Sequence, residues 1–190
     1  MTWNYSHTLL LPGDEVSNPV ELSNGSVILD MRGHDLRSYD QGDPNNAMRW
    51  LGRSDDGGTQ WPRGRAHIRP FVNGSSTPAG QPMHFGGDCF GDMTSVIVGA
   101  HCRGCSPGDT IVMGAIHRDG QGGGISGRSD YRVHKSVDGG STWTLVAQVY
   151  SGSVSYSGIR AVNSTHVGVM INAGPMACGA HTKYVVVKFS

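Results

Sequence analysis

The sequence predicts an all-β protein, and three features support this class. Glycine accounts for 29 of 190 residues, about twice its usual share. No stretch keeps an apolar period of about 3.6 residues, so we expect no helix. The pattern Ser-x-Asp-x-Gly-x-x-Trp occurs at residues 54–61 and again 82 residues later, at 136–143. Together these features predict many short strands joined by turns.

The repeated pattern describes a hairpin turn in which each side chain has a defined place. We call residues 54–61 the first box and residues 136–143 the second box. Ser and Asp two positions apart can hydrogen-bond to the turn backbone, the glycines adopt positive φ, and the Trp ring covers the turn. These roles are structural. The boxes therefore indicate a fold and perform no chemistry.

The composition excludes several classes of protein. The formal net charge is zero, which argues against a nucleic acid or a membrane surface as partner. No apolar run approaches the ~20 residues that span a bilayer, and residues 1–4 lack the basic and apolar regions of a signal peptide. We expect one core and one partial domain over residues 1–190, without a second domain.

The first fifty residues predict a loop followed by a hairpin. An apolar run ends at a Pro-Gly pair, and Glu15 follows in an expected loop. Two β-rich runs, 19–22 and 27–32, flank an Asn-Gly turn, which is the strongest short hairpin signal. Arg32 therefore lies at the end of a strand. Residues 33–47 are polar and irregular and predict a long loop.

The rest of the chain alternates short strands with loops rich in glycine and proline. Further strands are expected at residues 48–53, 68–72, 95–100, 110–116, 131–136, 144–149, 167–171 and 184–189. The 82 residues from box to box equal about two units of ~40–50 residues, the length of a four-stranded propeller blade. We therefore expect a β-propeller of which the chain holds about three to four blades.

The cysteines leave three interpretations open, namely disulfides, a metal site and free thiols. The cysteines are Cys89, Cys102, Cys105 and Cys178. Disulfides are favoured, because a bridge from Cys89 to Cys102 or Cys105 would close one loop. Four cysteines allow three pairings. The metal site would be a zinc site made by the Cys-x-x-Cys pair with His84 and His101, although a single such pair is weak evidence. Four N-x-S/T sequons, at Asn4, Asn24, Asn73 and Asn163, are compatible with export.

Residues around the boxes resemble those of one enzyme family. The boxes look like the Asp-boxes of sialidases (neuraminidases), whose fold is a six-bladed β-propeller. Residues 15–33 are similar to the family stretch in which a catalytic Glu precedes a short hairpin and then an Arg. Arg128 stands eight residues before Ser136, as in the family's next signature, and residues 155–159 resemble the segment that carries the family's tyrosine.

The resemblance implies an exo-α-sialidase, or a fragment of one, that hydrolyses terminal sialic acids by a retaining mechanism. Arg32 and Arg128 would bind the substrate carboxylate, for which guanidinium groups have a matching bidentate geometry. Tyr156 would be the nucleophile, because a neutral phenol is not repelled by the anionic sugar as a carboxylate would be. A phenol with a pKa of ~10 needs a base, and that role falls to Glu15. This mechanism requires no metal and no cofactor.

Each of these residues has an alternative interpretation. An Arg at a strand end is more often a solvated surface residue, and Tyr131, Tyr150 or Tyr184 could replace Tyr156 on composition alone. Glu21 competes with Glu15, but it lies within a strand-like run and is expected to face solvent. The order of the four signatures favours the residues named above.

The chain also departs from the family pattern. The family's first clamp arginine and its general-acid Asp precede the catalytic Glu, and the fourteen residues before Glu15 offer no candidate for either. The chain thus looks like the C-terminal half of a sialidase, with a sialylated glycan as substrate and a missing N-terminal half as partner. A non-catalytic sialoside-binding or scaffold propeller, and a glycosidase of another sugar, are the alternatives. Cysteines, sequons and resemblance together suggest a secreted or lumenal location.

Overall fold

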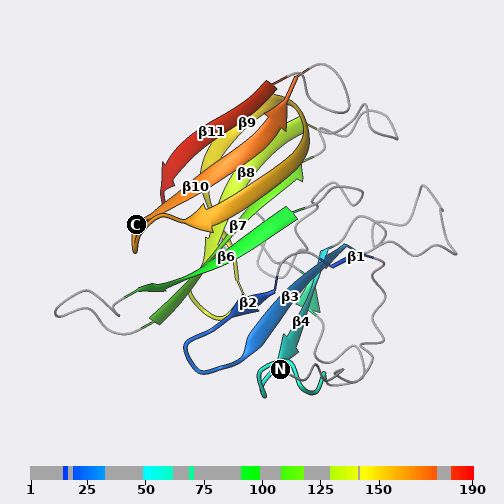
Figure 1. The fold of residues 1–190 in the computed structure, drawn as a ribbon, viewed down its shortest axis with the longest axis vertical. Helices are drawn as coiled ribbons and strands as arrows, with labels where there is room; N and C mark the ends of the chain where they lie inside the picture. Colours follow the sequence, from blue (N-terminus) through cyan, green and yellow to red (C-terminus); the bar gives the residue numbers. More distant parts are fainter. Residues whose placement is uncertain are drawn as a thin grey trace, which may run out of the picture.

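The computed structural model describes residues 15–16, 19–32, 49–61, 69–70, 91–98, 108–117, 129–140, 142–174 and 181–190. Every regular element in these ranges is a strand, as predicted, and the strands form two antiparallel sheets (Figure 1). The strands are β1 (Glu15–Val16), β2 (Val20–Glu21), β3 (Val27–Arg32), β4 (Arg49–Ser54), β5 (Arg69–Pro70), β6 (Gly91–Val98), β7 (Gly108–His117), β8 (Ser129–Ser136), β9 (Thr144–Ala161), β10 (His166–Ala173) and β11 (His181–Lys188).

Blade 1 is built around β3, which has β4 along one edge and both β1 and β2 along the other. Glu15 pairs with Arg32, and Val20 pairs with Ile28, so β1 and β2 form a single interrupted strand. The short strand β5 pairs with the outer edge of β4 and ends at Pro70, a residue that sheets accommodate at their edges. Blade 1 therefore has four strand positions.

Blades 2 and 3 share the long strand β9. Its first half pairs with β8 as far as Ser153, which lies opposite Ser129. Its second half pairs with β10, beginning with Val154 opposite Ala173. Blade 2 thus contains β6, β7, β8 and the first half of β9, and blade 3 contains the second half of β9 with β10 and β11. The partial propeller predicted from the sequence is confirmed, with two four-stranded blades and three strands of a third.

Three expectations about the elements are corrected. The strand expected to end at residue 149 continues to Ala161, because the chain meets β10 as a new partner after it leaves β8. Glu15 lies in β1 and not in a loop, since the ladder along β3 extends beyond the interruption. The two boxes belong to neighbouring blades and are not two blades apart, because the first box follows β4 of blade 1 and the second follows β8 of blade 2. The apolar run at 8–11 and the expected loop at 33–47 lie outside the described residues.

The bend in β9 explains one glycine. A Cβ atom on Gly152 would lie 2.9 Å from ring atoms of Tyr150, so only glycine lets this ring lie across the backbone. The ring is also covered by Lys183 of β11, whose Nζ lies 4.2 Å from the ring centroid. These contacts stabilise β9 where it passes from blade 2 to blade 3.

Strand β7 of blade 2 is buried on both faces and lies between two hydrophobic clusters. Its uninterrupted apolar run, which is typical of a strand without a solvent face, accounts for this position. One cluster joins β7 to blade 1 and comprises Val20, Leu22, Ile28, Ile111, Met113, Ala115 and Trp143. The other joins blade 2 to blade 3 and comprises Val112, Ile116, Tyr131, Val133, Val154, Ile159, Val167, Val169, Ile171, Ala173, Val187 and Phe189. Blades therefore pack face to face.

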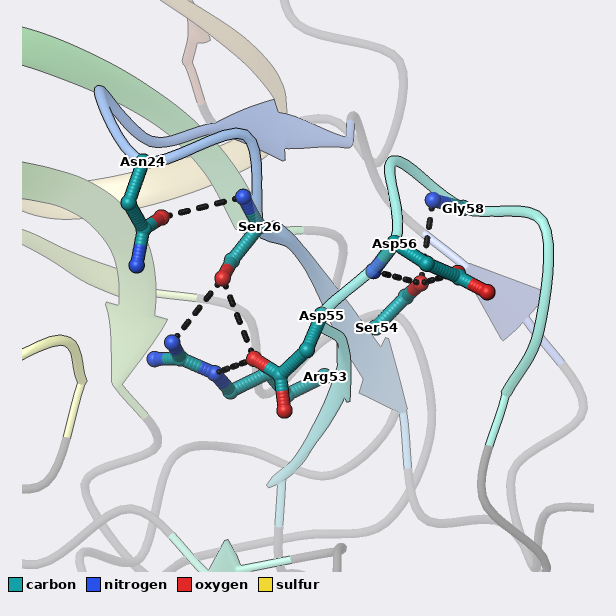
Figure 2. A network of polar contacts seen from close by, with 7 residues as sticks. All are labelled: Asn24, Ser26, Arg53, Ser54, Asp55, Asp56 and Gly58. Atoms are coloured by element: carbon teal, nitrogen blue, oxygen red, sulfur yellow. Dashed lines mark hydrogen bonds and ion pairs between the residues drawn. The ribbon is translucent and has the colours of Figure 1, made fainter.

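The first box forms the hydrogen bonds that its residue types predict (Figure 2). Ser54 Oγ donates to Asp56 Oδ1 at 2.8 Å and accepts from the backbone N–H of Gly58 at 2.9 Å. The indole Nε1 of Trp61 donates to the carbonyl of Gly58 at 3.0 Å, which places the ring over the turn. Gly57 and Gly58 have φ of 71° and 86°, values that favour glycine.

The second box repeats this arrangement. Ser136 Oγ donates to Asp138 Oδ1 at 2.7 Å and accepts from the N–H of Gly140 at 2.9 Å. Trp143 Nε1 donates to the carbonyl of Gly140 at 3.1 Å. Gly139 and Gly140 have φ of 68° and 87°. The structural role predicted for both boxes is therefore confirmed.

A polar network ties the first box to the β2–β3 hairpin. Arg53 donates through Nε to Asp55 Oδ1 at 2.6 Å and through Nη2 to Ser26 Oγ at 2.9 Å (Figure 2). The Ser26 hydroxyl donates in turn to Asp55 Oδ1 at 3.0 Å, and its backbone N–H donates to Asn24 Oδ1 at 3.0 Å. The hairpin and the box thus form one unit.

The same hairpin also reaches blade 2. The backbone N–H and the hydroxyl of Ser23 both donate to Asp109 Oδ2, at 3.0 and 2.8 Å. A Cβ on Gly139 of the second box would lie 3.3 Å from Arg53 Nη1, so the guanidinium lies against that turn. The two boxes and the β2–β3 hairpin therefore lie at the same end of the two blades, which we call the box end.

Candidate functional site

Strand register places the predicted site of blade 1 away from the box end. Val27, at the start of β3, pairs with Ser54 of the first box. Arg32, at the end of β3, pairs with Arg49 at the start of β4. Glu15 pairs with Arg32, and Figure 1 shows β1 at the end of β3 opposite the first box. We call this the far end of the blades.

Blade 2 has the same polarity. Ile111 of β7 pairs with Ser136 at the box end, whereas His117 of β7 pairs with Ser129 where β8 begins. The start of β8 therefore lies at the far end. Arg128, the second predicted clamp arginine, lies outside the described residues, directly before this strand start.

Glu15 and Arg32 are brought together by the backbone. Seventeen positions apart in the sequence, they are direct partners in the antiparallel ladder between β1 and β3. Residues in such a pair lie on the same face of a sheet, with Cα atoms ~4.5–5.5 Å apart. The backbones of a Glu and an Arg are therefore paired directly at the far end of blade 1.

Tyr156 lies at the far end of blade 3. The second half of β9 starts at Val154, directly after Ser153 has paired with the far-end residue Ser129. Tyr156 is two residues further on, and 49% of its surface is exposed, while its neighbour Ser155 is buried. A tyrosine near the start of this half-strand presents its ring to solvent close to the far end.

The first strands of the three blades lie next to one another. β6 contacts β2 and β3 of blade 1 and also contacts β9. Because β7 and β8 separate β6 from the first half of β9, the strand that β6 meets is the second half, which carries Tyr156. Glu15 and Tyr156 therefore belong to the strands nearest to the centre of the partial ring.

The competing residues occupy different positions. Tyr131 is fully buried in the core, Tyr150 belongs to the outer strand of blade 2 beneath Lys183, and Tyr184 lies on β11. Glu21 is exposed at the box end of β2, as expected. Among the tyrosines compared, Tyr156 is the one carried by a first strand.

One feature at the far end was missed in the sequence. Asp130 has φ of 63° and is skipped in the ladders on both sides of β8, so it forms a bulge two residues after Arg128. Its Oδ1 accepts from Gln148 Nε2 at 2.6 Å, and its Oδ2 pairs with Arg132. The bulge changes the direction of the backbone at the start of β8. An Asp beside Ser and Tyr gives no sequence signal for such a bend.

No group of three or more His, Cys, Asp or Glu side chains suited to a metal ion occurs among the described residues. All four cysteines, together with His84 and His101, lie outside them, so the choice among disulfides, zinc and free thiols stays open. Within the described part of the chain, no helix has the length and apolar character needed to cross a membrane.

Comparison of sequences finds no matching protein-family model and no matching curated protein. Comparison of structures does find similar folds. The Hadza microbial sialidase Hz136 matches with a TM-score of 0.57 and 18% identity, over 93% of this chain and 28% of that chain. A mutant of the NanB sialidase from Streptococcus pneumoniae matches with a TM-score of 0.53 and 13% identity, over 92% and 23%.

A third match is the α-L-arabinofuranosidase Arb93A from Fusarium graminearum. Its TM-score is 0.54 at 16% identity, over 92% of this chain and 45% of that chain. Across such matches the chain spans between 23% and 48% of the solved chains. The chain therefore has the fold of part of a glycosidase-type β-propeller, shared with sialidases and with an arabinofuranosidase.

Proposed function

We propose that the chain is part of an exo-α-sialidase that releases terminal sialic acids from glycoconjugates by a retaining mechanism. The observation that supports this best is the direct pairing of Glu15 with Arg32 at the same end of the blades as Tyr156. A substrate that carries its own carboxylate needs a guanidinium beside the catalytic pair. The register of β1 and β3, which puts Arg32 opposite Glu15, supports this assignment.

In the proposed reaction, Arg32 and Arg128 hold the substrate carboxylate. Glu15 takes the phenolic proton as the oxygen of Tyr156 bonds to the anomeric carbon and the glycosidic C–O bond breaks. The leaving oxygen accepts a proton from a general acid. Water, which gives a proton back to the conjugate base of the general acid, then attacks the anomeric carbon. The bond to the Tyr156 oxygen breaks, and the proton held by Glu15 returns to the phenolate. Glu15, Arg32, Arg128 and Tyr156 do not supply the general acid or a third arginine, so the complete reaction needs further residues.

Binding of a sialic acid analogue tests the arginine clamp with the chain alone. The probe is 2,3-didehydro-2-deoxy-N-acetylneuraminic acid, whose flattened ring resembles an oxocarbenium ion, and the readout is its dissociation constant by calorimetry. Arg32→Ala is expected to weaken binding ~10–100-fold by removing charged hydrogen bonds. Arg53→Ala is the matched control, because Arg53 lies in β4 of the same blade beside the first box, at the opposite end from Arg32. Equal binding by both variants would contradict the assignment.

Turnover tests the nucleophile in a protein that contains the complete ring. Tyr156→Phe is expected to abolish hydrolysis of a 4-methylumbelliferyl sialoside while leaving binding of the analogue unchanged. Tyr184→Phe makes the same chemical change on the exposed strand β11 and should retain activity. Normal turnover by the Tyr156 variant would refute its role.

Two other functions have support. The match to Arb93A favours a glycosidase of a neutral sugar; such a protein would bind an arabinofuranoside rather than the sialic acid analogue, and Arg32→Ala would leave that binding intact. The lack of candidates for the acid and the third arginine favours a non-catalytic sialoside-binding propeller. That protein would bind the analogue but show no turnover even as a complete ring.

We also propose a secreted or lumenal location. Asn24 and Asn163 of two sequons are exposed, each in a turn between strands. When the chain is expressed through a eukaryotic secretory pathway, endoglycosidase treatment should therefore lower its apparent mass. An unmodified chain from that pathway would count against the proposal.

A further inference from the structure

The face of blade 3 that points away from blade 2 carries an exposed apolar patch, with Arg160, His166 and Lys188 on the same face toward the box end. Met170, Tyr184 and Val186 are 53%, 62% and 50% exposed, although each lies in the middle of a strand. Tyr184 pairs with Met170, and Val186 pairs with Gly168, so all four residues share this face. The alternate residues of β10 are buried against blade 2.

The equivalent face of blade 2 is built in the same way. The Tyr131 ring lies across Gly114, at a distance that would exclude any Cβ, and Tyr184 lies across Gly168 in the same manner. In each blade the tyrosine stands two residues before the strand partner of that glycine. The corresponding pairs are Tyr131 and Tyr184, Val133 and Val186, Gly114 and Gly168, and Ile116 and Met170. We call this surface the Tyr face of a blade.

The surroundings of the two Tyr faces differ. Tyr131, Val133 and Ile116 are at most 1% exposed, because blade 3 covers them. Their equivalents in blade 3 are at least half exposed. In blade 2, the surface that covers the Tyr face is the aliphatic face of the next blade.

The opposite surface of each blade can be matched in the same way. Ser136 pairs with Ile111 in blade 2, as Ser54 pairs with Val27 in blade 1. The buried surface of blade 2 that meets blade 1, formed by Ile111, Met113 and Trp143, therefore corresponds to Val27, Leu29 and Trp61 in blade 1. We call this the Trp face. In blade 1 these three residues are only half-buried.

Both described joints between blades bring the Tyr-face side of one blade against the Trp-face side of the next. Among the described residues, the Tyr face of blade 3 and the Trp face of blade 1 lack such a partner, and each is the kind of surface that the other would bury. We propose that two copies of the chain associate head to tail, each Tyr face of blade 3 covering the Trp face of blade 1 in the other copy. Two arcs of nearly three blades would close into one ring with two joints. The association needs no enzymatic activity, so it stands or falls separately from the proposed function.

Light scattering during size-exclusion chromatography tests the association. The purified chain is expected to have twice its mass of 20.2 kDa. Val186→Lys places a charge in the proposed joint and should raise the dissociation constant on the order of 30-fold or more. Val137→Lys is the matched control, since Val137 is 71% exposed at the tip of the second box and outside both faces. A wild-type chain that stays monomeric at all concentrations would overturn the proposal.

Mixing blocked copies tests the head-to-tail geometry. Leu29→Lys blocks the Trp face, so this variant and Val186→Lys should each be largely monomeric, whereas their mixture should form a pair through the one intact joint. Circular dichroism of each variant confirms its β-structure before mixing. Self-pairing of Leu29→Lys would show contact between two Tyr faces and would contradict the proposal. A mass that keeps growing with concentration would show an open chain and would contradict ring closure.

Discussion

The two boxes have the same internal geometry but different surroundings. In both, a buried serine accepts from a glycine N–H at 2.9 Å, and an indole donates to a glycine carbonyl. Yet Trp143 is fully buried between blades 1 and 2, whereas Trp61 is only half-buried. The hydrogen bonds of a box are local, and its contribution to packing depends on the neighbouring blade.

The residue before each box shows a second difference. Arg53 lies against Gly139 of the next blade and pairs with the exposed Asp55. Lys135, at the same position before the second box, donates through Nζ to the backbone carbonyl of Phe189 in the next blade at 2.6 Å. Lys135 therefore hydrogen-bonds to the following blade, whereas Arg53 only touches it, because its hydrogen-bond partners Asp55 and Ser26 belong to its own blade.

The largest expected effect separates the two tryptophans. Trp143→Ala should lower the free energy of unfolding by about 3–5 kcal/mol, because it opens a cavity between two blades. Trp61→Ala should lower it by about 1–2 kcal/mol, since less apolar surface is lost. Urea unfolding followed by circular dichroism measures both. Equal losses would mean that neighbouring blades do not decide the contribution of a box.

The two serines should behave alike. Ser54→Ala and Ser136→Ala each remove the acceptor for a glycine N–H and should each lower the free energy of unfolding by about 1–3 kcal/mol. Both serines are at most 1% exposed, so water cannot replace the lost bond. Hydrogen exchange at Gly58 and Gly140 should accelerate in the respective variant only. Different losses at the two serines would show that the box geometry is not purely local.

Arg53 and Lys135 should contribute less. Arg53→Ala should lower the free energy of unfolding by about 0–1 kcal/mol, because the side chains of Arg53 and Asp55 are 39% and 72% exposed. Lys135→Ala removes one charged hydrogen bond and should have a somewhat larger effect. The same urea titrations measure both. A clearly greater loss for Arg53 would show that its contact with the turn at Gly139 couples the two blades.

The smallest effect is a pH dependence of the first box. The backbone N–H of Gln60, followed by the hydroxyl of Ser54, lowers the pKa of Asp56 below its ordinary value of 3.8. Because the folded pKa lies below the unfolded one, the ionised carboxylate stabilises the fold above pH 3.8, and this contribution disappears as the pH falls through the folded pKa. Asp56→Asn should therefore reduce the acid sensitivity of unfolding. An unchanged pH profile would contradict this origin.

Much of the fold could be predicted because its signals are local. The Asn-Gly turn defines the β2–β3 hairpin, and the box residues carry their own hydrogen-bond partners within eight positions. The course of β9 beyond residue 149 could not be predicted, since it depends on pairing with β10. The distance between the boxes was misinterpreted because a count of residues does not say how many strands lie between two turns.

The candidate site could likewise be predicted only in part. Arg32 was expected at a strand end, and it ends β3. The pairing of Glu15 with Arg32 could not be predicted. It belongs to a ladder that is interrupted between β1 and β2, and no residue type indicates where such a ladder resumes. The bulge at Asp130 likewise depends on the strands on both sides of β8.

The sequence by itself determined the all-β class, the two boxes and the hairpin, because hydrogen bonds and backbone conformations within a few residues specify them. Only the tertiary structure decided which tryptophan is buried, which strands lie at the centre, and which face of blade 3 stays exposed. These properties depend on contacts between blades, whose partners are distant in the chain and share no local pattern.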